Sequence, residues 1–498
     1  MISASNIPLV NRAISNKDRV AIIDRGGVHR YREVINQSFK ITQCLLNTTS
    51  DLKEARIAFI CPPGIDYVAT QWGIWQAGGI TVPLCPSHPL SEIEYVINTA
   101  GVKVIIAHPE YAQFINPLIK TRNLVLIHSN TAEDISEVSL PHLEVNRKAM
   151  ILFTSGTTSK PKGVVTTHRN IMAQITSLVE SWEISSNDRI LHVLPLHHIH
   201  GIINALYCPL WAGASCEMMS GFNADTVWEK FVKTDLTLFM AVPTIYIKLI
   251  AFWDKAGREE KETMSTACSK MRLMISGSAP LPVDILEKWK DICGHTLLER
   301  YGMTEVGMVL SNPLHGKRKP GYVGIPLPGV KLQLVKDTGD IVTEDMKEGE
   351  IQVKGENVFQ EYWGNAQSTQ DAFKGGWFRT GDIAVIKSGY YRILGRDSTD
   401  IIKSGGYKIS ALEIEEALRS HPKIAECAIV GIKDNEWGER ICAAVVTKDN
   451  CELTLDSLRI WAQTRIAKYK IPSRLKIVPH LPKNLMAKVI KPEVKKLF

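Results

Sequence analysis

The chain has 498 residues, 45% of them apolar and 22% charged, and these proportions are ordinary for a soluble globular protein. They exclude disordered, collagen-like and coiled-coil classes, and the length allows roughly two to four domains with sizeable cores. The 59 Lys and Arg residues against 52 Asp and Glu residues give a net charge of +7, which suits an anionic small molecule such as a nucleotide but is too dilute for a nucleic-acid surface.

The cysteines and the apolar runs indicate in which kind of compartment the protein is found. The ten cysteines contain no C-x-x-C pair and are too sparse for a disulfide scaffold, so we expect mostly buried free thiols in a reducing compartment. No uninterrupted apolar run approaches the roughly 18–20 residues that a membrane span requires, so we expect no membrane span. The stretch Met1–Lys17 carries Arg12, Lys17, three serines and no acidic residue, which gives it a weak likeness to a mitochondrial presequence.

Along the chain, strand-like apolar runs alternate with amphipathic stretches from about Arg19 onward. This alternation predicts an α/β protein with largely parallel sheets. The clearest predicted strands are Ala55–Cys61, Val102–Ala107, Leu124–His128 and Met271–Ile275, and the clearest predicted helices are Asp66–Ala77 and Ser91–Ala100.

After Pro313 the pattern changes to short strands separated by Gly and Pro, which predicts a small β-rich subdomain. Its strands are expected within Gly321–Gly329, Gly349–Gly355 and Tyr390–Gly395. The last hundred or so residues restart with helix and strand signals and are interpreted as a separate α+β domain, joined near Arg396–Asp400. Its elements are expected at Ala411–Arg419, Ile424–Gly431 and Ile441–Thr447.

The most informative segment is Met150–Gly163, MILFTSGTTSKPKG, in which an apolar strand leads into small, hydroxylated and basic residues. Hydroxyl donors, a close-approaching glycine backbone and lysine charge suit a polyphosphate. The Walker A pattern is excluded, because counting from Gly156 places Pro161 where that pattern requires glycine. On local grounds alone, the alternative is a flexible polar loop.

Together with several further motifs, this segment resembles the signature of the adenylate-forming superfamily of acyl-CoA synthetases, adenylation domains and luciferases. The resemblance runs from about residue 19 to the end of the chain. The further motifs, in the order of the superfamily, are Ser276–Leu281 (SGSAPL), Tyr301–Glu305 (YGMTE), Tyr362–Trp363, Trp377–Asp382 (WFRTGD), Gly395–Arg396, Ser404–Tyr407 (SGGY) and Pro482–Lys488 (PKNLMAK).

The resemblance implies a fold and a division into domains. We expect an α/β class in which a large N-terminal domain, residues 1–395, holds two α/β subdomains and the β-rich subdomain. A small mobile C-terminal α+β domain, residues 396–498, would turn between two half-reactions about a hinge at Asp397–Asp400. This hinge segment is one residue longer than the common spacing, and Ala487 stands where glycine is usual; which residue pivots stays open.

The implied cofactors and substrates are ATP, Mg²⁺ and CoA. The β- and γ-phosphates of ATP would be held by Thr154, Ser155, Gly156, Thr157, Thr158, Ser159, Lys160, Pro161 and Lys162, and its nucleoside by Gly277, Ser278, Tyr301, Asp382 and Arg396. The assignment of Asp382 also has a physical reason of its own, because a carboxylate is the natural acceptor for both ribose hydroxyls. Taken singly, it could also be a turn residue.

Three residues are implied in catalysis. Thr304 would touch the α-phosphate, Glu305 would hold Mg²⁺, and Lys488 would reach the α-phosphate and the carboxylate during adenylation only. Taken singly, Lys488 in a basic tail could be a solvated charge. The CoA tunnel would be formed by Ser404, Gly405, Gly406 and Tyr407.

The identity of the acid depends on three basic residues. Arg300 stands where most relatives have a small residue, at a position lining the acid's tunnel, and a cation there favours a second carboxylate over a long fatty tail. A surface or interdomain ion pair of Arg300 with Glu299 or another neighbour is the alternative. Arg272 would assist or be structural. By resemblance, His200 borders the acyl pocket; zinc at His197–His200 is disfavoured because no Cys or acid lies at ligand spacing.

Four segments narrow the resemblance to malonyl-CoA synthetases of the eukaryotic branch, which are mitochondrial in animals. They are Leu194–Asn204, Phe239–Tyr246, Leu297–Glu305 and Ser404–Glu413. Malonate is the leading substrate, with methylmalonate tolerated. The alternatives are a short-chain or aryl acid–CoA ligase, an enzyme that loads a carrier protein, and a catalytically silent nucleotide-binding protein. A mitochondrial location is implied, with the cytoplasm as the alternative, and the oligomeric state stays open.

Overall fold

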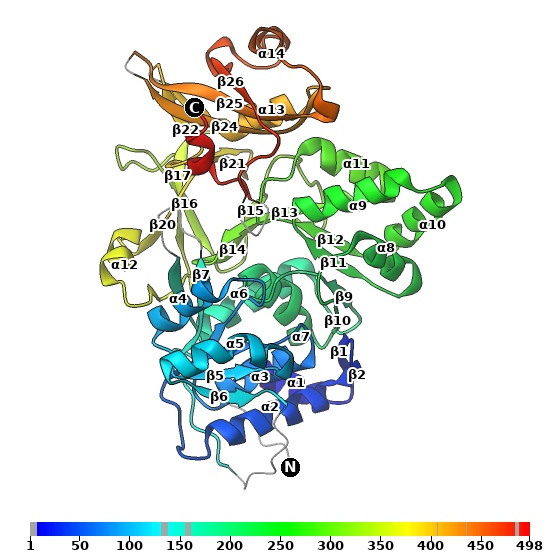
Figure 1. Cartoon of the computed structure of the whole chain (residues 1–498), viewed down its shortest axis with the longest axis vertical. Coiled ribbons are helices and arrows are strands. Elements are labelled where there is room, and N and C mark those ends of the chain that lie inside the picture. Colours follow the sequence, from blue (N-terminus) through cyan, green and yellow to red (C-terminus); the bar gives the residue numbers. More distant parts are fainter. Residues whose placement is uncertain (1–6, 131–137, 155–160, 406, 435, 484–487) are drawn as a thin grey trace.

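Four β-sheets and their covering helices organise the part of the chain that the structure describes (Figure 1). The computed structural model describes residues 7–130, 138–154, 161–405, 407–434, 436–483 and 488–498. The predicted fold class is confirmed: two α/β sheets and one β-rich sheet form the large part, and a small α+β unit lies at the end of the molecule opposite the first α/β sheet.

The first α/β subdomain is built on a seven-stranded sheet in the order β18-β8-β7-β4-β3-β5-β6. Strands β3 to β7 run parallel, whereas β8 and β18 are antiparallel additions at one edge. Helix α3 is buried on every side from Tyr67 to Gln76, as its largely apolar sequence allows. The elements are β3 (Arg56–Ile60), α3 (Ile65–Gln76), β4 (Ile80–Pro83), α4 (Leu90–Ala100), β5 (Val104–Ala107), α5 (Pro109–Arg122), β6 (Val125–His128), β7 (Lys148–Thr154), β8 (Lys162–Thr167) and β18 (Glu361–Tyr362).

The second α/β subdomain is built on a nine-stranded sheet in the order β15-β14-β13-β12-β11-β9-β10-β1-β2. One continuous hydrophobic core joins it to the first sheet, since residues of both belong to the same buried cluster. Its elements are α1 (Pro8–Ser15), β1 (Val20–Asp24), β2 (Gly27–Arg30), α2 (Tyr31–Leu45), α6 (His168–Trp182), β9 (Arg189–His192), η1 (His200–Tyr207), α7 (Cys208–Ala212), β10 (Ser215–Met218), α8 (Ala224–Lys233), β11 (Leu238–Ala241), α9 (Pro243–Lys255), α10 (Arg258–Ser269), β12 (Leu273–Ser276), α11 (Val283–Cys293), β13 (Leu298–Met303), β14 (Gly307–Ser311) and β15 (Ile325–Pro326).

The β-rich subdomain is an antiparallel five-stranded sheet with one short helix. The strands predicted at Gly349–Gly355 and Tyr390–Gly395 are present, whereas Gly321–Gly329 contributes only the two residues of β15, which pair with β14 of the second sheet. The elements are β16 (Lys331–Val335), β17 (Gly349–Lys354), α12 (Ala366–Ala372), β19 (Phe373–Lys374), β20 (Trp377–Lys387) and β21 (Tyr390–Arg396).

The small unit has its own sheet and its own buried clusters. The turn that enters it follows Arg396, near the predicted boundary. Its elements are β22 (Ile401–Ser404), β23 (Tyr407–Ser410), α13 (Ala411–Arg419), β24 (Ile424–Asp434), β25 (Gly438–Thr447), η2 (Lys448–Asn450), α14 (Leu455–Ala462), η3 (Lys468–Lys470), β26 (Arg474–Ile477) and α15 (Lys491–Lys495).

Three expectations about the chain as a whole can be compared with the structure. All ten cysteines are free, eight of them buried and two half-buried. Part of the stretch that has a likeness to a presequence is a structural element, because α1 packs Leu9, Val10 and Ala13 into the core. Among the described residues, no helix is both long enough and apolar enough to cross a membrane.

Candidate active site

The hairpin between β7 and β8 carries the polar segment that we predict to hold phosphates. Thr154 ends β7 and pairs with Lys162 at the start of β8. The carbonyl oxygen of Pro161 accepts a 2.9 Å hydrogen bond from the hydroxyl of Tyr95 on α4. The described ends fix where the segment leaves the sheet and where it returns. Outside the described residues lie Ser155, Gly156, Thr157, Thr158, Ser159 and Lys160.

Glu305 lies next to this hairpin, in the short turn between β13 and β14, and only 7% of it is exposed. The Tyr362 hydroxyl donates a 2.9 Å hydrogen bond to its Oε1. The ammonium of Lys162 lies 4.9 Å from the centroid of the Tyr362 ring. Burial raises the pKa of Glu305. A carboxylate oxygen is a hard ligand that Mg²⁺ prefers, and bound Mg²⁺ would favour its charged form, so Glu305 fits a magnesium ion on a triphosphate.

Tyr362 is the residue of this site that the sequence analysis missed. The sequence indicates Tyr362 only as part of the motif Tyr362–Trp363, without a role for its hydroxyl. Its position depends on β18 pairing with β8, far apart in sequence, with Tyr362 opposite Val164. No local pattern signals that pairing.

The predicted ribose acceptor lies where β13, β20 and β21 meet. Asp382 on β20 is paired in register with Arg396 on β21, and Arg396 Nε donates a 3.1 Å hydrogen bond to Asp382 Oδ1. The Tyr301 hydroxyl, from β13, donates to the other carboxylate oxygen. Burial would lower the pKa of Arg396, but the charge and the hydrogen bond of Asp382, with Tyr301 and Glu305, together outweigh it and raise the pKa. The carboxylate is therefore held in one orientation by two donors.

The loop after β12 brings three of the predicted site residues together. Ser278 adopts a left-handed backbone conformation with φ of 69°, and its Oγ lies 3.2 Å from Nδ1 of His200. A Cβ on the preceding Gly277 would lie 2.4 Å from Nη1 of Arg300. Glycine is therefore required for the guanidinium of Arg300 to lie against this backbone.

Arg300 is a buried cation without a carboxylate partner among the described residues. It is 3% exposed, and its Nη2 makes one long hydrogen bond, 3.5 Å, to Ser278 Oγ. In the part of the chain that the structure describes, its Nε and Nη1 have no hydrogen-bond partner. Burial lowers the pKa of Arg300 to about 9, so the group is still charged at neutral pH. Two guanidinium nitrogens are therefore left for a ligand.

The alternative ion pair between Arg300 and Glu299 is not formed. Glu299 is also buried, at 6% exposure, and accepts a 3.3 Å hydrogen bond from the backbone N–H of Gly321. Arg300 does not stabilise its charged form, and burial raises the pKa of Glu299 to about 8. Glu299 and Arg300 have different surroundings because successive residues of a strand point to opposite faces of the sheet.

His200 begins η1, a π-helix whose eight residues are all buried. Short π-helical segments are rare and occur often at functional sites. Burial, followed by the charge of Arg300, lowers the pKa of His200 well below its usual range, so the imidazole is neutral at pH 7. His200, Ser278 and Arg300 form one connected polar row.

The structure corrects the expectation that Arg272 assists in the substrate pocket. Its Nε and Nη2 donate to both oxygens of Asp188, at 3.1 and 2.9 Å, and its Nη1 donates to the carbonyl of Trp182 at 2.9 Å. All of its guanidinium nitrogens are thus engaged in holding strand β12 to the end of α6. Arg272 has a structural role.

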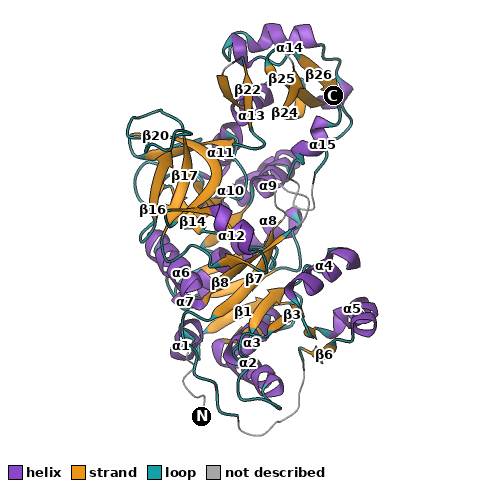
Figure 2. Ribbon diagram, turned by 90° about the vertical axis from the view of Figure 1, so that its left-hand side faces the viewer, coloured by secondary structure: helices purple, strands orange, loops and turns teal. Residues whose placement is uncertain are grey.

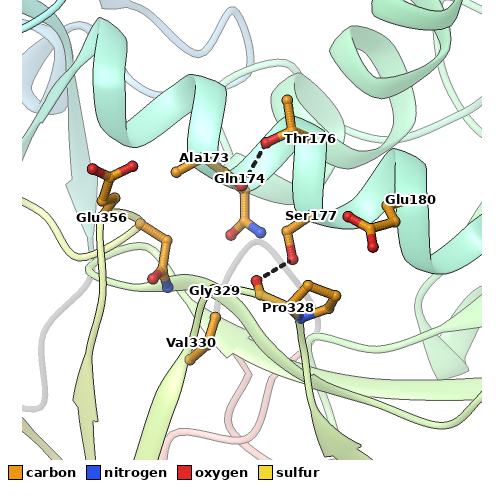
Figure 3. Close-up of a pocket in the computed structure, with 10 residues that line it drawn as sticks. Ala173, Gln174, Thr176, Ser177, Glu180, Pro328, Gly329, Val330 and Glu356 are labelled. Atoms are coloured by element: carbon orange, nitrogen blue, oxygen red, sulfur yellow. Dashed lines mark hydrogen bonds between the residues drawn. The ribbon is translucent and has the colours of Figure 1, made fainter.

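A cavity of about 430 Å³ lies beside α6 rather than at these residues (Figure 3). Ser177 on α6 points across it and donates a 2.9 Å hydrogen bond to the carbonyl of Pro328. The predicted site residues do not line it. Thr304 lines a separate, smaller cavity with Asn170 and Asn357.

Comparison with known families identifies the chain. The model of the "AMP-binding enzyme" family matches residues 9–363, and that of the "AMP-binding enzyme C-terminal domain" matches residues 413–488. The chain belongs to the AMP-binding enzyme family. The human protein named "Malonate–CoA ligase ACSF3, mitochondrial" is 43% identical over 98% of this chain and 92% of its own length.

Solved structures show the same family relationship. The ATP-bound crystal structure of MatB from Rhodopseudomonas palustris has a TM-score of 0.89 at 30% identity, with 99% of each chain covered. The apo crystal structure of the same protein gives a TM-score of 0.81 with the same identity and coverage. This member of the AMP-binding enzyme family is thus more similar to the ATP-bound form.

Lys488 of the small domain lies near Arg300, Arg396 and Asp382 of the large domain, and it keeps an exposed surface. Partial desolvation, and then the positive charges of Arg300 and Arg396, lower the pKa of Lys488, while Asp382 opposes them. Helix α15, which follows Lys488, lies on the side of the small domain that faces the large one (Figure 2). The predicted catalytic lysine is thus brought to the residues predicted for ribose and acid.

The described residues of the segment predicted for the CoA tunnel make contacts within the small domain. Ser404 is buried, Gly405 donates its N–H to the carbonyl of Trp437, and the ring of Tyr407 stacks on Tyr469 at 4.6 Å. Both aromatic partners belong to the small domain, and Tyr407 is 55% exposed. Gly406 lies outside the described residues.

Proposed function

We propose that the chain is an ATP-dependent, AMP-forming acid–CoA ligase that converts malonate to malonyl-CoA through an acyl-adenylate, and that it also accepts methylmalonate. The full-length similarity to a protein named as a malonate–CoA ligase supports this substrate, as does the similarity to ATP-bound MatB. The observation that carries the proposal is Arg300, a buried guanidinium with two nitrogens left for a ligand.

The first half-reaction joins the acid to the nucleotide. A carboxylate oxygen of malonate attacks the α-phosphorus of ATP, and pyrophosphate leaves. Charge on the phosphate oxygens must be offset at fixed positions, which is how proteins accelerate phosphoryl-type transfer. Lys488 and Thr304 are assigned to the α-phosphate, and Glu305 would hold Mg²⁺ on the triphosphate.

The second half-reaction releases the product. The CoA thiol loses its proton and attacks the carbonyl carbon of the acyl-adenylate, and the C–O bond to AMP breaks. Because Tyr407 and Gly405 make their contacts within the small domain while Lys488 is near Arg300 and Asp382, we propose that the small domain rotates about the turn at 397–400 between the two steps.

Arg300 would select the acid by its second carboxylate. A fork of two N–H donors matches a carboxylate geometrically, and pairing removes the cost of a buried, unpaired cation. A fatty chain at the same place would leave that cation buried against methylene groups, which is unfavourable. Malonate is short enough for one carboxylate to react while the other binds.

The test is CoA-dependent AMP formation with malonate, methylmalonate, acetate and octanoate, on the wild type and on Arg300→Ala. We expect the variant to lose about 1.5–3 kcal/mol of binding to malonate, a decrease in kcat/KM of roughly 10- to 150-fold, with acetate little affected. Arg272→Gln is the matched control, expected to lower the unfolding temperature without changing the malonate-to-acetate ratio.

Two outcomes would contradict the assignment. A wild-type preference for octanoate, or an unchanged malonate-to-acetate ratio in Arg300→Ala, would leave a short-chain, aryl or general acid–CoA ligase. Absence of ATP–pyrophosphate exchange with every acid would instead indicate a catalytically silent nucleotide-binding protein.

We also propose a mitochondrial location. It is supported by the name of the human relative, which includes that compartment. Fractionation of cells that express the full natural chain should recover it with a matrix marker; recovery with a cytosolic marker would overturn this part of the proposal.

A further inference from the structure

Three side chains that have no role in the proposed reaction meet where the two α/β sheets adjoin. Cys85 and His88 follow β4, at the carboxyl end of a strand of the first sheet, and His197 follows β9, at the carboxyl end of a strand of the second. One donor atom from each residue lies within 4.8 Å of the other two. Folding thus brings Cys85 close to His197, although the two residues lie far apart in the sequence.

The cluster is held by a surrounding set of contacts. Cys85 is 5% exposed, and its Sγ lies 3.0 Å from Oγ of Ser87. The backbone N–H of His88 donates to the carbonyl of Cys85 at 3.1 Å, which closes the turn that brings the two side chains to one side. The Glu92 carboxylate lies 3.3 Å from Nδ1 of His88. A carboxylate on one imidazole nitrogen orients the ring and leaves the other nitrogen for a metal.

We propose that Cys85, His88 and His197 form a zinc site, with three protein ligands and one open position. One thiolate and two imidazoles are donors typical of Zn²⁺, whereas Mg²⁺ prefers oxygen ligands such as Glu305. Bonds of about 2.0–2.3 Å in a tetrahedron separate the donors by roughly 3.3–3.6 Å. The donors must therefore close by at most about 1.5 Å, through rotation of the two half-buried imidazoles.

The proposed zinc site is also connected to the predicted acid pocket through a short series of contacts. His197 is three residues before His200, whose Nδ1 contacts Ser278, which in turn accepts the one hydrogen bond from Arg300. The His197 ring also packs on His198, with centroids 4.1 Å apart. A metal that draws His197 towards β4 would strain this short segment, so zinc is expected to inhibit acid activation. This second part rests on the proposed function.

Binding is tested without any substrate. The full chain, freed of metal by a chelator, is titrated with Co²⁺, whose thiolate charge-transfer and tetrahedral absorption bands report the ligand set, and Zn²⁺ affinity is measured by competition with a chromogenic chelator. We expect one Co²⁺ per chain, loss of the charge-transfer band in Cys85→Ser, and weaker Zn²⁺ binding in His88→Gln and His197→Gln. Glu92→Gln should weaken Zn²⁺ about 10- to 100-fold by releasing the His88 ring.

Cys451→Ser is the matched control, since Cys451 is a half-buried thiol in the small domain; it should bind both metals as the wild type does. Mg²⁺ in excess should not displace Co²⁺. A charge-transfer band that persists in Cys85→Ser, or Zn²⁺ affinities of both histidine variants equal to that of the wild type, would overturn the site. Because the histidine variants test it independently, a folding defect in Cys85→Ser does not remove the test.

The inhibitory effect is tested separately, by ATP–pyrophosphate exchange with malonate at matched Zn²⁺ concentrations. Zn²⁺ should inhibit the wild type and Cys451→Ser, and should inhibit Cys85→Ser far less. Equal inhibition of all three chains would overturn the regulatory part. Failure of malonate as a substrate would overturn the proposed function but would leave the metal titrations unaffected.

Discussion

Lys491 contacts Asp400 across the small domain, with its Nζ 3.1 Å from Oδ1 of the carboxylate. The same ammonium lies 2.6 Å from Oε1 of Glu415 and donates to the carbonyl of Ile429 at 2.9 Å. Asp400 ends the turn that enters the small domain, and Lys491 begins the helix after Lys488. One buried cation therefore links the segment that follows the predicted catalytic lysine to the predicted hinge.

Lys491→Met should loosen this connection. Removing one partner from a buried ionic network leaves Asp400 and Glu415 without their cation, which costs about 3–5 kcal/mol. Hydrogen exchange measured by mass spectrometry should speed up strongly in β24 and α13. Lys495→Met is the control, because Lys495 makes only a half-exposed contact of 3.9 Å with Glu439, worth about 0–1 kcal/mol. Equal protection in both variants would show that the network is not needed for stability.

Lys488→Ala should slow only the first half-reaction. The lysine is placed near Arg300 and Asp382 in this arrangement, where its charge would stabilise developing phosphate charge. Loss of one such group typically costs about 10²- to 10³-fold in rate. ATP–pyrophosphate exchange should fall by this factor, while thioester formation from a supplied acyl-adenylate is retained. Lys483→Ala, which breaks a surface contact with Glu426, should leave both rates unchanged; equal loss of both rates in Lys488→Ala would contradict this role.

Tyr362→Phe should weaken the magnesium site without disturbing the packing of the ring. The phenyl ring keeps its contact with Lys162, whereas the 2.9 Å hydrogen bond to Glu305 is lost. Loss of such an orienting partner typically lowers metal affinity about 10- to 100-fold. The Mg²⁺ concentration for half-maximal activity should rise accordingly. Tyr390→Phe, which removes a 3.0 Å bond to the carbonyl of Lys317, is the control and should not shift it.

Glu299 should make the protein less stable as the pH rises. Burial raises the pKa of Glu299 from 4.5 to about 8, so between these values the unfolded chain has lost a proton that the folded chain retains. Stability then falls with pH by up to about 1.4 kcal/mol per unit, and levels off above pH 8.

Glu299→Gln should remove this component, since the amide stays neutral and can still accept from Gly321. Unfolding temperatures of the two chains, measured from pH 5 to 9, should diverge with rising pH in favour of the variant. A constant difference over this range would mean that Glu299 titrates normally in the folded protein.

Local patterns in the sequence determined the succession of elements. Helix α13 begins and ends where its apolar spacing predicted, and β3, β5 and β6 lie within the predicted strands, because strand and helix periodicities are properties of short segments. The motifs also determined which chemistry to look for, since glycine, hydroxyl, carboxylate and lysine positions are set by what a nucleotide requires. None of this depends on knowing which strands are neighbours.

Only the tertiary structure decided which of these side chains share a site. Arg272 precedes β12 and Arg300 lies within β13 of the same sheet, yet the guanidinium of Arg272 is fully bonded to Asp188 and Trp182, whereas that of Arg300 is buried with nitrogens left for a ligand. Tyr362 reaches Glu305, and Cys85 reaches His197, because elements of two separate sheets lie side by side at these points. Such contacts join residues far apart in the chain, and their energies depend on burial and on partners that no short segment contains.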